Sequence, residues 1–159
     1  MPSAAVVGAL VERGLTIAVA ESLTGGMLVS ELIATPGASA TVLGGVVAYD
    51  TRLKHTLLGV DADLLAAAGA VDARVAEQMA DRVRAVLAVD GRPADVGIST
   101  TGVAGPDPQD GKAVGTVFVG LAMGERVSSI ELSLAGSRSA IRSATVAEAL
   151  VQLHKMLEG

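Results

Sequence analysis

Three side chains with the chemistry of an acyl-transfer site occur within the first 54 residues: Ser22, Tyr49 and Lys54. A serine hydroxyl becomes a nucleophile when a neighbouring base accepts its proton, and a partly desolvated lysine can be that base. His55 is the other candidate base, but one residue further round a helix it points about 100° away from Lys54. The simpler interpretation of Lys54 is a solvated surface residue.

Ser22 lies where a strand is expected to end and a helix to begin. The apolar run Thr16–Ala20 predicts a buried strand, and Thr24-Gly-Gly26 precedes an amphipathic run over Met27–Ile33. Unpaired N–H groups and the helix dipole at such a junction stabilise negative charge. Alternatively, Ser22 or Thr24 is only an N-cap and the glycines only form a turn.

A second strand is expected to bring Tyr49 and Lys54 to the same place. The valine-rich run Thr41–Tyr49 predicts this strand, and its Gly44-Gly45 pair indicates a bulge or a close backbone approach. Asp50 or Thr51 can cap a short helix that carries Lys54. Ligands of α/β sheets gather at the carboxyl ends of parallel strands. If the two strands are parallel neighbours, Ser22, Tyr49 and Lys54 meet at one edge of the sheet.

The remaining sequence alternates helices and strands first and then pairs strands locally. Helices are expected from Ser3 to Gly14, over Asp61–Ala68, from Asp72 to Leu87 and over Gly136–Glu158; strands are expected over Asp95–Thr100, Val114–Met123 and Arg126–Leu134. The short link at Gly124 favours an antiparallel hairpin. This order predicts an α/β fold, a three-layer α/β/α sandwich on a mixed, mostly parallel sheet.

A second glycine-rich segment, Thr101–Gly111, follows a predicted strand. Gly102 and Gly105 do not belong to a P-loop, because no Gly-Lys-Ser/Thr follows, and no G-x-G-x-x-G opens a helix here. A simple turn is the alternative. Arg138 and Arg142 share one face of the last helix and can clamp an anionic group, with a solvated charged face as the alternative.

Composition limits the classes of function. The chain has 159 residues, a net charge of −5, no cysteine and only 1% aromatic residues. The acidic balance argues against nucleic-acid binding, and no apolar run approaches the roughly 20 residues of a membrane span. The two histidines form no metal-ligand pattern. We expect one domain over residues 1–159, cytoplasmic, with neither a nucleic acid nor a membrane as partner.

The chain also has more small apolar side chains than one core readily hides. Half of its residues are hydrophobic and only 18% are charged. Exposed apolar patches usually mark interfaces, so we expect a symmetric homo-oligomer. The candidate surfaces are the strand Val42–Val47 and the last helix, with Val146, Leu150 and Met156.

Several motifs together resemble one known family. They are, in order, Ala20-Glu-Ser-Leu-Thr-Gly-Gly26, Val46-Val-Ala-Tyr-Asp-Thr-Arg-Leu-Lys54, Thr101-Gly-Val-Ala-Gly-Pro106 and Gly136-Ser-Arg-Ser-Ala-Ile-Arg142. This pattern resembles the carboxy-terminal domain family of the competence/damage-inducible protein CinA, whose stand-alone members are nicotinamide-nucleotide amidases. The resemblance covers nearly the whole chain.

The resemblance implies an amidohydrolase that converts nicotinamide mononucleotide to nicotinate mononucleotide and ammonia, with no metal or redox cofactor. It implies Ser22 as nucleophile, Lys54 as general base and Tyr49 as a proton relay to the leaving ammonia. The residues expected to bind the nucleotide are Thr24, Gly25, Gly26, Thr101, Gly102, Gly105, Arg138 and Arg142. Either glycine-rich segment can supply the N–H groups that bind the oxyanion.

Two interpretations without catalysis stay open at this point. One is a regulatory module that binds a nucleotide and turns nothing over. The other is an interaction protein in DNA uptake or damage response, which only the family's name suggests.

Overall fold

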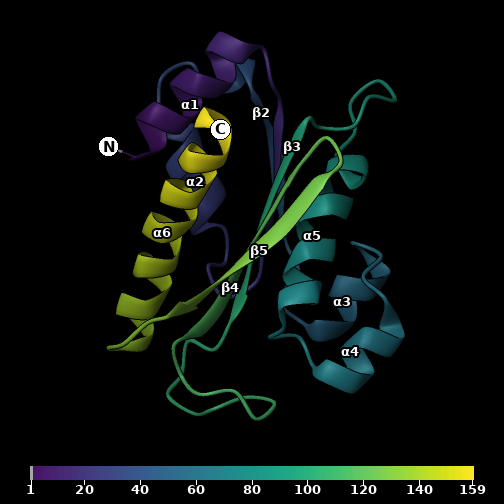
Figure 1. Ribbon diagram of the computed structural model, residues 1–159, viewed down its shortest axis with the longest axis vertical. Coiled ribbons are helices and arrows are strands. Elements are labelled where there is room, and N and C mark those ends of the chain that lie inside the picture. Colours follow the sequence, from purple (N-terminus) through teal and green to yellow (C-terminus); the bar gives the residue numbers. More distant parts are fainter. Residues whose placement is uncertain (1) are drawn as a thin grey trace.

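A five-stranded sheet with helices on both faces forms the protein in a computed structural model that describes residues 2–159 (Figure 1). The strands are β1 (Ile17–Glu21), β2 (Val42–Val47), β3 (Val96–Gly102), β4 (Thr116–Met123) and β5 (Arg126–Ser133). The helices are α1 (Pro2–Arg13), α2 (Met27–Ile33), α3 (Thr51–Thr56), α4 (Ala62–Ala68), α5 (Ala73–Val86) and α6 (Arg138–Glu158), with a 3-10 turn at Ala38–Ala40.

The strand order is β2-β1-β3-β4-β5. β1 pairs in parallel with both β2 and β3, whereas β4 is antiparallel to β3 and β5. Four of the five strands therefore run in one direction. The predicted mixed α/β/α sandwich and the hairpin at Gly124 are confirmed, and β1 and β2 are parallel neighbours as the site requires.

Alternation along β1 divides the core into two layers, because successive side chains of a strand point to opposite faces. Ile17 and Val19 pack with α1, α2 and α6, whereas Ala18 and Ala20 pack with α5. In Figure 1 helices α1, α2 and α6 cover one face of the sheet, and α3, α4 and α5 cover the other. The next two residues continue the alternation: Glu21 belongs to the α2 side and Ser22 to the α3 side.

Strand β2 has both features that its Gly44-Gly45 pair indicated, a bulge and a close backbone approach. The β1–β2 register passes from Ile17 opposite Val42 to Ala18 opposite Gly44, so Leu43 is the extra residue of a bulge. A Cβ atom on Gly45 would lie 3.0 Å from Cβ of Val29, so α2 packs directly on this backbone. The bulge and the contact fix where β2 ends relative to Ser22.

Some predicted boundaries are wrong. β1 extends to Glu21 instead of ending at Ala20. Helix α1 already includes Pro2, which suits a first helical turn, so Ser3 is not its cap; the Ser3 hydroxyl donates to Glu31 instead. Helix α6 starts at Arg138, because the Ser137 hydroxyl accepts from the backbone N–H of Ala140 and caps it.

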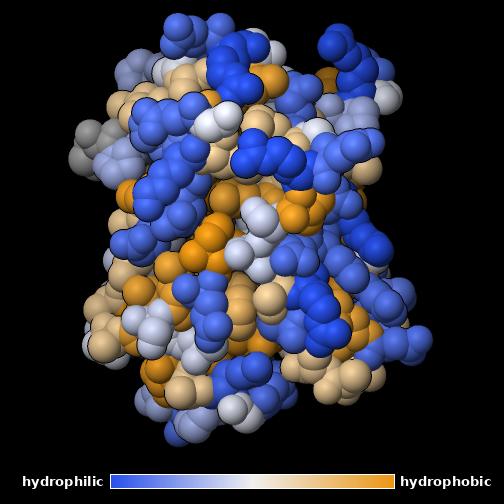
Figure 2. All heavy atoms as spheres, viewed as in Figure 1, coloured by the Kyte–Doolittle hydropathy of each residue, from blue (hydrophilic) through white to orange (hydrophobic). Residues whose placement is uncertain are grey.

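The surfaces expected to drive oligomerisation are partly buried within the chain. On α6, Val146, Leu150 and Met156 are at most 9% exposed, because they pack against the sheet and α1, so this helix offers no such surface. Edge strand β2 keeps Val47 at 43% exposure, and the other edge, β5, keeps Val127 at 40%. Figure 2 shows apolar side chains at the surface across the middle of the face over which β5 runs.

The homo-oligomer therefore stays a prediction that rests on the two edge strands. Light scattering at micromolar concentration tests it, and a mass of one 15.8 kDa chain would contradict it. Among the helices of residues 2–159, none is long and apolar enough to cross a lipid bilayer.

Candidate active site

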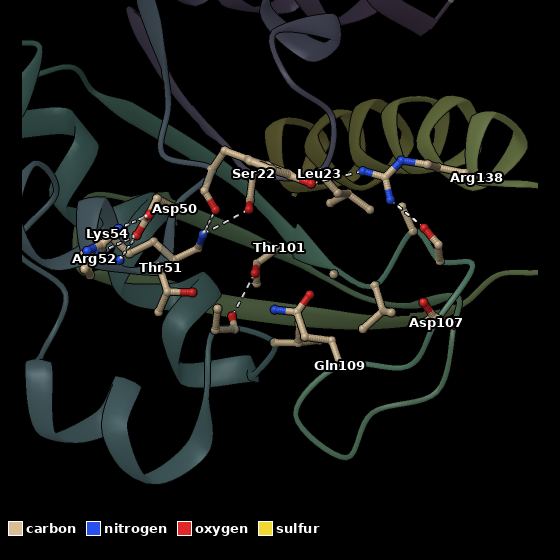
Figure 3. Close-up of a pocket in the computed structure, with 17 residues that line it drawn as sticks. Ser22, Leu23, Asp50, Thr51, Arg52, Lys54, Thr101, Asp107, Gln109 and Arg138 are labelled. Atoms are coloured by element: carbon tan, nitrogen blue, oxygen red, sulfur yellow. Dashed lines mark hydrogen bonds and ion pairs between the residues drawn. The ribbon is translucent and has the colours of Figure 1, made fainter.

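A cavity of about 520 Å³ opens at the carboxyl ends of β1 and β3, within the usual size of small-molecule sites (Figure 3). Its lining combines three sources: the turn after β1, the segment from Tyr49 to Lys54, and the loop after β3. Ala70 and Val71, between α4 and α5, and Arg138 at the start of α6 also line it. The parallel arrangement of β2, β1 and β3 is what brings these distant segments together.

Ser22 and Lys54 contact each other at the base of this cavity. Lys54 Nζ lies 3.0 Å from Ser22 Oγ, and the two side chains are 1% and 7% exposed, respectively. Helix α3 supplies Lys54, and the Asp50 carboxylate caps that helix by accepting from the N–H of Arg52. The predicted pairing of Ser22 with a lysine is present, and Lys54 is not a solvated surface residue.

The surroundings of the Lys54 amine suit a neutral base. Besides Ser22, its partners are the backbone oxygens of Ala48 at 2.7 Å and Tyr49 at 3.5 Å. A neutral amine has two N–H donors and one lone pair, so the two carbonyls can take the donors and the lone pair can face Ser22 Oγ. Burial lowers the pKa of Lys54 to about 8, although the Asp50 charge opposes this shift.

The Asp50 carboxylate is held in its charged form by a neighbour. Hydrogen bonds from the Arg52 side chain and backbone hold the pKa of Asp50 well below its usual range. The ion pair of Asp50 is with Arg52, and none with the Lys54 amine is present among the described residues. His55 is turned away from the pair, with its Nδ1 2.8 Å from the backbone oxygen of Val60.

Tyr49 lines the cavity but faces a different partner from the one expected. Its side chain is 61% exposed, and its hydroxyl accepts from Arg138 Nη2 at 3.0 Å. Arg138 Nη1 also donates to the Gly105 backbone oxygen at 2.5 Å. Arg138 therefore bridges the two walls of the cavity, and proton relay by the Tyr49 hydroxyl stays a prediction.

The N-terminus of α2 is not free to bind an anion. The Glu21 carboxylate is fully buried and accepts from the backbone N–H groups of Leu28 at 2.8 Å and Val29 at 3.1 Å. The expectation of unpaired N–H groups at this helix start is wrong for these two residues. A negative side chain there satisfies both donors and complements the helix dipole.

The sequence interpretation missed this role of Glu21. The direction of Glu21 could have been predicted from the alternation of side chains along β1, because a residue two places after Val19 points to the same face, the α2 side. An acidic residue placed next to an expected helix start is suited to bind its N–H groups.

Four of the residues expected to bind substrate do not line the cavity: Thr24, Gly25, Gly26 and Arg142. Thr24 is buried, with its hydroxyl 2.8 Å from that of Thr100, and the Gly25 N–H donates to the Ser22 backbone oxygen. Arg142 Nε donates to the Leu23 backbone oxygen at 2.8 Å. These contacts hold the turn that carries Ser22.

The other predicted binding residues do line the cavity: Thr101, Gly102, Gly105 and Arg138. The Thr101 hydroxyl donates to the Ala70 backbone oxygen at 2.8 Å, which joins β3 to the start of the segment before α5. The fold and this cavity define an α/β protein with a buried serine–lysine pair at the carboxyl edge of its sheet.

Comparison with known proteins identifies the family. Residues 2–157 match the family described as CinA C-terminal domain, and the chain belongs to this family. A CinA-like protein of Frankia casuarinae is 48% identical over 97% of this chain, which spans 34% of that relative's length. The chain thus corresponds to about a third of the curated relative.

Solved structures of similar proteins have the same fold. A competence damage-inducible protein A from Klebsiella pneumoniae aligns with a TM-score of 0.92 and 31% identity, covering 99% of this chain and 95% of that one. A competence/damage inducible protein from Agrobacterium tumefaciens aligns with a TM-score of 0.89 and 31% identity, covering 99% and 94%.

Proposed function

We propose that this protein hydrolyses the carboxamide of nicotinamide mononucleotide to nicotinate mononucleotide and ammonia. The observation that carries the proposal is the contact between Ser22 Oγ and the buried Lys54 amine. A buried hydroxyl and an amine of lowered pKa are the groups that covalent amide hydrolysis needs.

In the proposed reaction Ser22 Oγ attacks the amide carbon while Lys54 Nζ accepts the hydroxyl proton. The tetrahedral intermediate then breaks its C–N bond, and the amine leaves as ammonia after receiving a proton. Water attacks the resulting ester in the same way, which releases the carboxylate and restores the Ser22 hydroxyl. Lys54 serves as base in each addition and as acid in each elimination.

The oxyanion of this intermediate needs N–H donors aimed at it. Of the two glycine-rich segments, the one after β3 lines the cavity, so its backbone is the better candidate. Val103 N–H is already used in a bond to Thr116, which leaves Ala104 and Gly105 as the proposed donors. Arg138 is the proposed partner of the phosphate, because it is a cation at the cavity wall.

Incubation of the purified protein with nicotinamide mononucleotide, with ammonia as the readout, tests this function. The Ser22→Ala variant should release no ammonia yet bind the nucleotide in calorimetry, because the hydroxyl acts in the covalent step. Ser30→Ala, an exposed serine on α2, should retain the wild-type rate.

Activity above a few per cent in Ser22→Ala contradicts the serine mechanism. Binding without turnover in the wild type supports the alternative, a regulatory module that binds a nucleotide.

A further inference from the structure

The cavity has a second polar wall, formed by Asp107 and Gln109, which the proposed mechanism does not use. Both residues line the cavity in the loop between β3 and β4. Figure 3 shows the Gln109 amide pointing into the cavity, on the opposite side from Ser22, and no hydrogen bond joins either side chain to the other residues drawn. Both side chains are exposed, so their polar groups are available to a ligand in the cavity.

The backbone holds this wall in place. Gln109 N–H donates to the Lys112 oxygen at 3.1 Å, and Lys112 N–H donates back to the Gln109 oxygen at 2.8 Å. Between them Asp110 and Gly111 have φ angles of 50° and 74°, as a tight two-residue hairpin requires. The tip packs on the end of α4, because a Cβ atom on Gly69 would lie 2.6 Å from Asp110 Oδ2. The Gln109 side chain is thus presented to the cavity from an anchored turn.

The chemistry of the two side chains restricts what they can bind. A carboxylate only accepts hydrogen bonds, whereas the glutamine amide both accepts and donates. A phosphate is attracted to the Arg138 guanidinium and repelled by the Asp107 carboxylate, so these two groups do not serve the same anion. The partner of Asp107 must be a neutral or cationic donor, and a sugar hydroxyl fits it.

We propose that Asp107 and Gln109 bind the two ribose hydroxyls and make the site selective for ribonucleotide amides, an inference that rests on the proposed function. A cis diol offers two O–H donors and two oxygen acceptors, which match one carboxylate and one amide. The two residues are separated only by Pro108, so both can reach one sugar. Selectivity of this kind arises because loss of a hydroxyl leaves polar groups of the site unpaired.

The test compares kcat/KM for nicotinamide mononucleotide with kcat/KM for its 2′-deoxy and 3′-deoxy analogues. The wild type should prefer the diol by about 10- to 100-fold, the range expected for a lost hydrogen bond to a charged group such as the Asp107 carboxylate. In Asp107→Asn and Gln109→Met the preference should fall to less than threefold, mainly through a higher KM for the diol substrate. Lys112→Gln, which changes the other side of the same hairpin, should keep the wild-type preference.

The test distinguishes failure of the proposed ribose selectivity from failure of the proposed amidase function. If the wild type releases ammonia from the diol and deoxy substrates at equal kcat/KM, Asp107 and Gln109 do not select for the ribose hydroxyls, although the proposed function holds. The same conclusion follows if the two variants lower kcat/KM for all substrates by one common factor. Release of ammonia from no substrate contradicts the proposed function itself.

Discussion

Two glycine-containing segments differ in role: residues 22–26 follow strand β1, and residues 101–105 form the end of the neighbouring parallel strand β3 and the start of its loop. The second lines the cavity with Thr101, Gly102 and Gly105. In the first, only Ser22 and Leu23 reach the cavity, and the threonine and glycines lie behind them. A glycine-rich turn after a β-strand is therefore compatible with either a ligand-facing or a supporting role.

The difference between the two segments depends on the element that follows each strand. Glu21 enters the α2 side as a buried carboxylate and binds the two N–H groups that open that helix. No helix follows β3 directly, and its loop instead returns to β4 in the hairpin of Gln109 and Lys112. The backbone of the first turn is thus engaged in holding α2, whereas that of the second borders open space.

The largest effect is expected at Lys54, because Lys54 is the proposed base for the Ser22 hydroxyl of the first segment. Lys54→Arg and Lys54→Ala should both lower kcat by about 100- to 10,000-fold, because arginine stays protonated and cannot accept the Ser22 proton. In the wild type the base is the neutral amine, whose pKa is about 8. The kcat/KM should therefore rise with pH through about 8 and fall about tenfold per unit below it.

Stopped assays from pH 6 to 10 measure this profile. A Lys54→Arg variant with a near-normal rate would leave Lys54 a purely electrostatic role.

An intermediate effect is expected from the two arginines of α6. Arg138 donates to Gly105 in the second segment, and Arg142 donates to Leu23 in the first. Arg138→Gln should raise the KM for nicotinamide mononucleotide about 10- to 100-fold, because it removes the guanidinium proposed to bind the phosphate. Arg142→Gln is the matched control: it loses the bond to the Leu23 oxygen and should change KM by less than threefold. Equal KM values in the two variants would contradict the division between a facing and a supporting segment.

The smallest effect is expected from the buried threonines of the two segments. Thr24→Val and Thr101→Val each remove one hydroxyl hydrogen bond and should lower the free energy of unfolding by about 1–2 kcal/mol, measured in urea. Only Thr101→Val should also lower kcat/KM, by a few-fold, because only Thr101 lines the cavity. A similar loss of kcat/KM in Thr24→Val would show that the first turn also contacts the substrate.

The order and type of the elements could be predicted from the sequence because they depend on local patterns. Apolar runs placed the strands, Asp50 and Asp72 capped the helices they precede, and Gly124 closed the hairpin. The parallel pairing of β1 and β2 was a condition of the predicted site, and it brought Ser22 and Lys54 together. Family motifs strengthened the choice of these two residues.

The tertiary structure decided which polar groups face the cavity and which form hydrogen bonds within the chain. Whether a polar group is free depends on residues from elsewhere in the fold: Thr100 contacts the Thr24 hydroxyl, and Arg142 donates to the Leu23 oxygen. The burial that lowers the pKa of Lys54 likewise depends on the placement of α3 beside Ser22 and Ala48, the residues that follow β1 and β2. Local sequence fixes the type of a side chain and its element, but its solvent exposure and its partners are properties of the assembled layers.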